Sequence, residues 1–378
     1  MSSRDVLSTL ADLIRINSIN PAYLQGRPEA EIQRWIYEFF VRQGISAESI
    51  EVLPNRPNVI ATVPGRDRSR RLLLEAHVDT AGVENMTCPP FEPQIRDGNM
   101  YGRGACDTKG GLAAMMHALL ELHQQGVPPP CDVVLAATMD EEHSYHGASH
   151  LCESLKASAA IVAEPTDLRM VVASKGCLRW RVTIGGRAAH SSKPHLGVNA
   201  ISRMARLIVS IEEEDPKLQE LRHPLVGGPT LNVGIIQGGA QVNIVPERCH
   251  VEIDRRLIPG EELPEVYRGY EDLSERLRSR FPDLEITHTP LLEDWPMETP
   301  SDSPIVRTAQ QVLQNLRLPS DPAGVPFGSD ASKFTRAGIP SIVMGPGSID
   351  QAHTAEEYVS IEQVEKAVTI YKEIALNF

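Results

Sequence analysis

Three acidic clusters between residues 77 and 142 combine the residue types that metal-assisted hydrolysis requires. The first is His77–Asp79, the second holds Asp107 within the glycine-rich segment Gly102–Gly111, and the third is Asp140–Glu142. Each cluster comes where an apolar run stops and a loop begins. One imidazole and several carboxylates at the ends of buried strands are the ingredients of a metal-dependent hydrolytic site.

Two further candidate ligands occur later in the chain. Glu164 follows the apolar run 161–163, and His353 lies in the loop after Val343 and Met344. In open α/β sheets, ligands bind beyond the carboxyl ends of the strands, so these side chains can converge although they are far apart in sequence. Two histidines and three carboxylates are enough for two metal ions that share one bridging group. Such a set, without thiolate, suits zinc, cobalt or manganese.

The elements that must position these residues alternate between helix and strand up to about residue 176. Apolar spacing predicts helices at 4–16, 31–43, 112–125 and 146–156, and strands at 59–63, 71–76, 132–139 and 159–163. The strands are almost continuously apolar, which is typical of an α/β sheet covered on both faces.

The pattern changes near Gly176. Strands at 178–184, 230–237, 249–257 and 283–288, with helices at 198–214 and 263–280, give the β-α-β-β-α-β order of a ferredoxin-like unit. The α/β pattern then resumes in a helix at 305–316, a strand at 339–344 and a helix at 361–376. The sequence therefore predicts one α/β domain, residues 1–176 and 293–378, interrupted by an inserted α+β domain at 177–292.

Composition limits the class of protein. The 378 residues are 41% hydrophobic and 23% charged, which is ordinary for globular proteins, and the net charge of −13 argues against a nucleic-acid partner. The six cysteines form no C-x-x-C pair and suit a reducing compartment. Residues 1–5 lack the basic and apolar regions of a signal peptide, and no apolar run could cross a membrane. We expect a soluble, cytoplasmic protein without a membrane partner.

Taken together, the motifs resemble those of the M20 metallopeptidase family, which includes acetylornithine deacetylase, succinyl-diaminopimelate desuccinylase, aminoacylase and carboxypeptidase G-type enzymes. They follow the family order over almost the whole chain, as His77–Asp79, Gly102–Gly111, Asp140–Glu142, Ala163–Thr166, His190–Pro194, Asn243–Pro246, Asp254–Gly260 and His353–Tyr358. The resemblance implies a zinc-peptidase-like catalytic domain with a covered mixed sheet. It also implies that the inserted ferredoxin-like domain serves as a lid and dimerisation domain.

The family pattern also implies a division of the ligands between two divalent metal ions, with zinc expected first and cobalt or manganese as alternatives. His77 and Glu164 would hold one ion, and Glu142 and His353 would hold the other. Asp107 would bridge the two.

Further roles follow from the same resemblance. Asp79 would hydrogen-bond the imidazole of His77 and fix its tautomer. Glu141 would take a proton from the attacking water and pass it to the leaving amine. His190, supplied by the lid domain of a second subunit, would stabilise the oxyanion. Arg256 and Asn243 would bind the substrate carboxylate and nearby polar groups.

The substrate class is an N-acyl amino acid or a small peptide. The segment 345–353 resembles the acetylornithine deacetylase branch, so N-acetylornithine is the leading candidate. Desuccinylase, aminoacylase, carboxypeptidase and dipeptidase activities stay open. We expect a homodimer through the inserted domain, because His190 otherwise has no clear route to the metals.

Two other classes of protein fit the sequence less well. A catalytically inactive binding relative would keep the fold, yet Glu141 and all five expected ligands are present. A dinucleotide-binding fold is disfavoured because no third glycine follows Gly102 and Gly104 at the fingerprint spacing, and Asp107 would repel a pyrophosphate.

Overall fold

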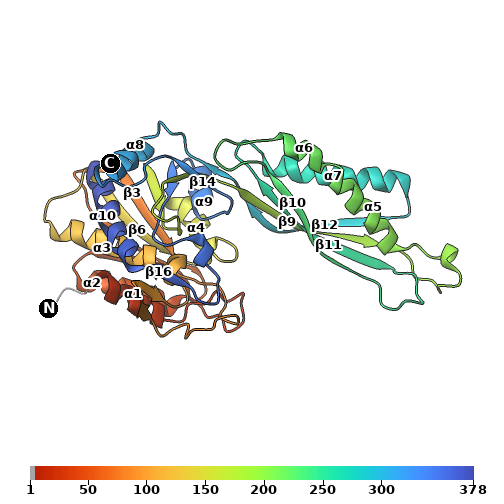
Figure 1. Cartoon of the computed structure of the whole chain (residues 1–378), viewed down its shortest axis with the longest axis horizontal. Coiled ribbons are helices and arrows are strands. Elements are labelled where there is room, and N and C mark those ends of the chain that lie inside the picture. Colours follow the sequence, from red (N-terminus) through yellow and green to blue (C-terminus); the bar gives the residue numbers. More distant parts are fainter. Residues whose placement is uncertain (1–4) are drawn as a thin grey trace. The chain divides into compact units, whose positions relative to one another are not determined.

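The computed structural model describes residues 5–378. Residue 4, where the first helix was expected to begin, lies outside the described residues, and so do residues 1–4 of the segment that lacks signal-peptide features. The chain divides into two compact units. The first unit comprises the described residues up to Val172, together with Glu298–Ala323 and Ser329–Phe378. The second comprises Ala173–Met297 and Gly324–Gly328. Figure 1 follows the chain through both units.

The first unit contains a large sheet and a set of covering helices. Its helical elements are α1 (Val6–Arg15), α2 (Ala30–Arg42), η1 (Ala105–Lys109), α3 (Gly110–Gln124), α4 (His146–Ser154), α8 (Pro304–Asn315), α9 (Ala331–Arg336), η3 (Ile349–Gln351) and α10 (Ile361–Asn377). Its sheet runs in the order β1 (Ser46–Leu53), β2 (Arg56–Val63), β6 (Cys131–Thr138), β3 (Asp67–His77), β7 (Ala159–Val162) and β15 (Ser341–Val343). The sheet continues to β8 (Val171–Ser174) and β13 (Met297–Glu298), with β14 (Ala323–Val325) beside β8.

The large sheet is mixed, as the sequence predicts. β3 pairs in parallel with β6 and β7, whereas β2 pairs antiparallel with β6. Because side chains alternate along a strand, Leu72, Leu74 and Ala76 of β3 join the hydrophobic core while Glu75 and His77 point to the opposite face. This alternation brings His77 out of the core at the carboxyl end of the strand.

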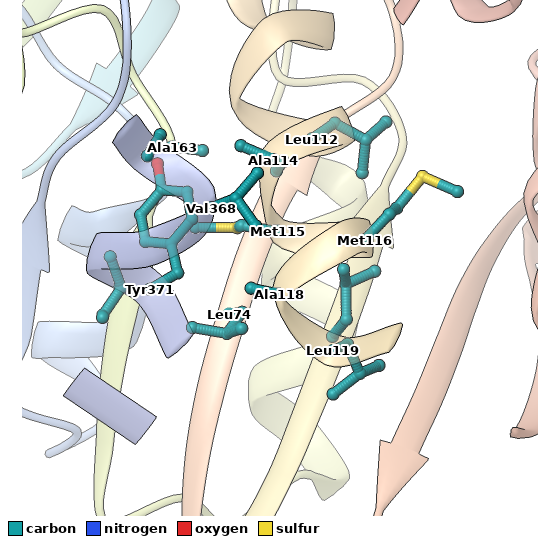
Figure 2. Close-up of a cluster of buried hydrophobic side chains, with 14 of the residues drawn as sticks. Leu74, Leu112, Ala114, Met115, Met116, Ala118, Leu119, Ala163, Val368 and Tyr371 are labelled. Carbon is teal, nitrogen blue, oxygen red and sulfur yellow. The ribbon is translucent and has the colours of Figure 1, made fainter. Parts of the chain in front are cut away.

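The core of the first unit is built around α3, which is buried on nearly all sides. Figure 2 shows Met115 and Ala118 of α3 packed beside Leu74 of β3 and Tyr371 of α10. The beginning of α3 lies tightly on the end of β7, because a Cβ at Gly111 would stand 2.7 Å from that of Ala163. This close approach fixes the segment that carries Asp107.

A separate three-stranded sheet in the first unit joins distant parts of the chain. It runs in the order β16 (Tyr358–Ser360), β5 (Asn99–Tyr101) and β4 (Gln94–Arg96), and both pairings are antiparallel. The loop after β5 therefore lies beside the segment that precedes β16.

The second unit is a four-stranded antiparallel sheet with helices packed on one face. Its elements are β9 (Gly176–Gly185), η2 (Pro194–Leu196), α5 (Ala200–Glu212), α6 (Asp215–Glu220), β10 (Thr230–Gly238), β11 (Arg248–Leu257), α7 (Leu263–Arg280) and β12 (Glu285–Asp294). The order β10-β11-β9-β12 is that of the expected ferredoxin-like unit. Fully buried Trp180 packs against Tyr270 of α7 at a ring-centroid distance of 4.9 Å.

The structure departs from the sequence prediction in several elements. The helix expected at 198–214 ends at Glu212, and α6 follows it as a separate helix. β1 was not predicted, because this edge strand is largely exposed and its polar residues, among them Glu48 and Glu51, obscure the strand pattern. The expected bounds of the catalytic domain (1–176 and 293–378) and of the inserted domain (177–292) stay a prediction.

Two further findings concern the cysteines and the helices. Every cysteine lies within residues 5–378, and none is in a disulfide. Among the described residues, no helix has the length and apolar character needed to cross a membrane.

Candidate metal centre

His77 and Asp107 form the middle of the site. His77 is the last residue of β3, and Asp107 lies in the irregular turn η1 that leads into α3. Nε2 of His77 is 3.0 Å from Oδ1 of Asp107, and both side chains are buried. The end of a strand and the beginning of a packed helix thus hold the imidazole and the carboxylate in contact.

Three glutamates reach the same place from β6 and β7, the two strands on either side of β3. Glu141 and Glu142 follow β6, after a turn in which Asp140 has a φ of 71°. Glu164 follows β7. The carboxylate oxygens of Glu141 and Glu164 lie 4.0 and 3.9 Å from Nε2 of His77.

His353 completes the cluster from the last third of the chain. It follows η3 and has a φ of 58°. Its Nε2 is 3.3 Å from Oδ2 of Asp107 and 3.1 Å from the carboxylate of Glu142. The two oxygens of Asp107 therefore face two different histidines.

The five expected ligands and Glu141 fall into two groups that could each hold a metal ion. One group is His77, Glu141 and Glu164, the other is Asp107, Glu142 and His353, and within each group the ligand atoms lie within 4.8 Å of one another. Oε1 of Glu164 is buried and has no hydrogen-bond partner. A buried carboxylate oxygen without a partner is costly unless a cation is bound to it. The donor set of imidazole and carboxylate fits divalent ions such as zinc.

The electrostatics agree with this fit. Burial raises the pKa of Glu141 well above its usual range, and the carboxylate of Glu164 raises it further. Burial also raises the pKa of Glu164, and the negative charge of Asp107 raises it further. Burial alone would raise the pKa of Asp107, but hydrogen bonds with His353 and His77 outweigh burial and lower it. The cluster has more carboxylates than cationic partners, and a divalent cation would relieve their repulsion.

Asp79 contacts the imidazole of His77 through its main chain. Nδ1 of His77 is 3.0 Å from the carbonyl oxygen of Asp79, while the carboxylate Oδ1 stands at 3.6 Å, beyond a direct hydrogen bond. The carboxylate instead accepts the backbone N–H groups of Glu141 and Glu142, each at 3.1 Å. Asp79 thus orients the imidazole through its main chain and the two glutamates through its side chain. The sequence could not separate these roles, because both contacts come from one residue.

Asn20, Arg56 and Glu29, which the sequence did not single out, support the turn at Asp140 that follows β6. Asn20 donates through Nδ2 to Asp79 at 2.8 Å and to Asp140 at 2.9 Å. Arg56 donates to Asp140 at 2.7 Å and holds buried Glu29 at 2.6 Å. No sequence signal marks them, since Asn20 lies in an irregular loop and Arg56 resembles an ordinary polar residue of a strand.

The three expected substrate-side residues lie in the second unit. His190 is exposed, and its Nδ1 is 2.8 Å from Oγ of Ser192. Asn243 is also exposed, one residue before Ile244, which forms a bridge with His190. Arg256 is half-buried, and its Nε donates to Asp254 at 2.8 Å. The structure thus brings His190 close to Asn243 and pairs Arg256 with an acid of its own strand.

The comparison with protein families decides which family the chain is in. Residues 73–377 match the sequence profile of peptidase family M20/M25/M40. The chain belongs to this family. The match covers the whole second unit, most of the first unit and every residue of the metal-ligand cluster, so the protein is a metal-dependent amidohydrolase or peptidase.

Curated relatives within this family carry two different names. The chain is 30% identical over 383 residues to the acetylornithine deacetylase of Myxococcus xanthus, covering 98% of this chain and 97% of the relative. It is 27% identical over 413 residues to a probable succinyl-diaminopimelate desuccinylase of Staphylococcus aureus strain MSSA476, covering 100% of this chain and 98% of the relative. Both matches are with hydrolases that would act on acylated amino acids according to their names.

A solved structure supports the fold. A tripeptidase of Staphylococcus aureus subsp. aureus Mu50 superimposes with a TM-score of 0.80 at 24% identity, covering 98% of this chain and 97% of that chain. This likeness supports a fold made of a large α/β unit and a second, smaller α+β unit.

Proposed function

We propose that this protein is a two-metal hydrolase that cleaves the amide bond of an N-acyl amino acid, with N-acetylornithine as the leading substrate. The observation that carries the proposal is the position of Asp107, whose two oxygens face His77 and His353 at 3.0 and 3.3 Å. A carboxylate placed in this way suits a bridge between two ions. His77 and Glu164 would hold one ion, and Glu142 and His353 the other.

The bound ions would lower the pKa of water and polarise the carbonyl oxygen of the substrate. Glu141 accepts the proton of the attacking water and later delivers it to the nitrogen of the leaving amine. Its burial and the nearby Glu164 favour the protonated form that this transfer passes through. Water and the amide are thereby converted into a carboxylate and an amine.

The substrate itself is bound by residues of the second unit in this proposal. His190 of the partner subunit stabilises the negative charge that develops on the carbonyl oxygen. Arg256 binds the substrate carboxylate with its planar guanidinium, and Asn243 binds neighbouring polar groups. Since Arg256 already donates to Asp254, that acid would orient the guanidinium for the substrate.

The choice of N-acetylornithine rests on segment 345–353 and on the relative of that name at 30% identity. Succinyl-diaminopimelate is the second candidate because the desuccinylase-named relative matches the full chain at 27%. Aminoacylase, carboxypeptidase and dipeptidase activities share the same metal chemistry.

A steady-state panel tests this choice. The chelator-treated protein is reloaded with zinc, cobalt or manganese and assayed on N-acetylornithine, succinyl-diaminopimelate, N-acetylmethionine and dipeptides. The highest kcat/KM is expected for N-acetylornithine. Equal rates across the panel would contradict the substrate assignment, and a protein that neither binds metal nor turns over any substrate would support an inactive binding relative instead.

We also propose a homodimer formed through the second unit. β10 is an edge strand of its sheet, and Ile235 and Ile236 on this strand are 43% and 55% exposed. An edge strand with apolar side chains is a template for pairing with another chain. Light scattering should give twice the chain mass for the active species, and an active monomer would rule the dimer out.

A further inference from the structure

Glu357 is a fully buried carboxylate that accepts hydrogen bonds from four donors at once. Its Oε1 accepts the backbone N–H groups of Cys106 at 2.9 Å and Asp107 at 3.0 Å. Its Oε2 accepts the N–H of Gly104 at 3.0 Å and Nη1 of Arg103 at 2.7 Å. Burial raises the pKa of Glu357 above its usual value, and the charge of Arg103 offsets part of this rise. Only an ionised carboxylate offers four acceptor positions with no proton of its own, so the four donors favour the ionised form.

These contacts fix the main chain of the bridging ligand. Three amides of the glycine-rich loop converge on one carboxylate, and the last of them belongs to Asp107 itself. Gly104 permits the turn because its φ is 79°, and a Cβ there would stand 2.7 Å from Thr80. Glu357 therefore fixes the position of Asp107 by holding its backbone N–H, on the side away from the candidate ligands.

Glu357 also fixes the segment that carries His353, four residues earlier. Its own carbonyl oxygen accepts the N–H of Gly102 at 3.1 Å, directly before β16 pairs with β5. Within the same segment, the carbonyl oxygen of Ala355 accepts the N–H of Thr87 at 2.9 Å. Glu357 thus joins the loop that carries Asp107 to the segment that carries His353.

We propose that Glu357 is a positioning residue of the metal centre, which sets Asp107 and His353 at the mutual distance that metal binding requires. The inference rests on the proposed two-metal function and goes beyond it, because Glu357 neither ligates nor touches substrate. Asp107, Glu142 and His353 form one of the two candidate ligand groups. Loss of the carboxylate would let two of those three ligands drift apart.

Glu357→Gln tests the proposal with little change in volume. A glutamine amide would turn its N–H₂ toward either the two amides at Oε1 or the pair of donors at Oε2, so one set would lose its acceptor. Mutation of a residue that hydrogen-bonds to a metal ligand typically lowers metal affinity by about 10- to 100-fold. We expect a loss of this size in zinc affinity, measured by chelator competition, with a lower kcat at limiting zinc and an unchanged KM once zinc is saturating.

Glu261→Gln is the matched control. Glu261 accepts an arginine N–H from Arg255 at 2.5 Å and a backbone N–H from Ile258 at 2.8 Å, but it lies in the second unit. Its substitution removes the same kind of contact without touching a candidate ligand. Zinc affinity should stay at the wild-type value in this variant.

The outcomes are separable. If Glu357→Gln lowers the melting temperature but binds zinc as tightly as wild type, the carboxylate serves folding only and the proposal is wrong. If the wild-type protein binds none of zinc, cobalt and manganese, the two-metal function itself is wrong. Should Glu357→Gln fail to fold, Glu357→Asp carries the test. It keeps the charge but shortens the reach, so wild-type zinc affinity in this variant would overturn the proposal.

Discussion

Carboxylates in the two units lie in different electrostatic surroundings. In the first unit, Glu141 and Glu164 share His77 at 4.0 and 3.9 Å, and burial raises the pKa of both acids. In the second unit, Asp254 lies between Arg179 at 2.7 Å and Arg256 at 2.8 Å. There burial is outweighed by the hydrogen bond from Arg179 and the charge of Arg256, which lower the pKa of Asp254.

The contrast separates acids that are suited to bind a metal ion from acids that form ion pairs within the fold. In the second unit, Asp254, Glu252 and Glu261 are each paired with an arginine of the same unit. The cluster around His77 in the first unit gathers acids without enough cationic partners, and this arrangement costs folding free energy unless an external cation is bound. Such a local loss of stability is typical of a functional site.

Removing an acid from each unit should affect the two units differently, and the largest expected difference is in the rate of hydrolysis. Glu141→Gln removes the proton acceptor while keeping the shape, and kcat should fall by about 10²- to 10⁴-fold with zinc content unchanged. The matched variant in the second unit is Glu252→Gln, since Glu252 pairs with Arg181 at 2.5 Å. Its kcat should remain near the wild-type value. A Glu141→Gln enzyme with wild-type kcat would remove the proton-transfer role.

A second effect of opposite sign is expected in the stability of the zinc-free protein. At pH 8, unfolded Glu164 ionises freely whereas the buried carboxyl resists ionisation, so Glu164→Gln should raise the free energy of unfolding by about 1 kcal/mol. Asp254→Asn loses paired arginines at a half-exposed position and should lower it by up to about 1 kcal/mol.

Urea unfolding in the presence of a chelator measures both changes. Zinc affinity should fall in Glu164→Gln and stay unchanged in Asp254→Asn. If both variants destabilise the zinc-free protein equally, the two kinds of acid do not differ in the way described.

The smallest effect is on the pH dependence of stability. Burial raises the pKa of Asp330 to about 6 from an ordinary value of 3.8. The stability that this raised pKa contributes is full below about 4 and is lost as the pH rises through 6. The pKa of Asp254 is lowered below 3.8, so its contribution is present above that value and is lost as the pH falls through the folded pKa.

The zinc-free variants Asp330→Asn and Asp254→Asn expose these slopes. Relative to Asp330→Asn, wild type should lose stability as the pH rises from about 4 to about 6. Relative to Asp254→Asn, it should lose stability as the pH falls below about 4. Slopes of the same sign for both variants would remove the distinction between the two units.

Much of the site could be predicted from the sequence, because strand ends are visible as the stops of apolar runs. His77, Glu142 and Glu164 lie at or after the ends of β3, β6 and β7 in the structure, and the parallel pairing of β3 with both neighbours brings them together. The ferredoxin-like order of the second unit was predicted from the apolar pattern of its strands, although the strand expected at 283–288 ends at Asp294 in the structure. The exposed edge strand β1 has no such pattern and was missed.

The supporting residues could not be predicted from the sequence. Asn20, Arg56 and Glu357 act through hydrogen bonds to segments 59 to 254 residues away, and nothing in their local pattern announces such a partner. Glu357 stands next to Glu356, and only the structure shows which of the two is buried. Local periodicity reports which face of an element is apolar, whereas a polar contact between loops depends on the finished fold.

Anomalous X-ray diffraction at the zinc edge from crystals of the zinc-loaded protein tests the central claim most directly. Two peaks are predicted, one within about 2.0–2.2 Å of His77 and Glu164 and the other within the same distance of Glu142 and His353. Both peaks should contact Asp107. A single peak, or two peaks without a shared carboxylate, would contradict a two-metal centre bridged by Asp107.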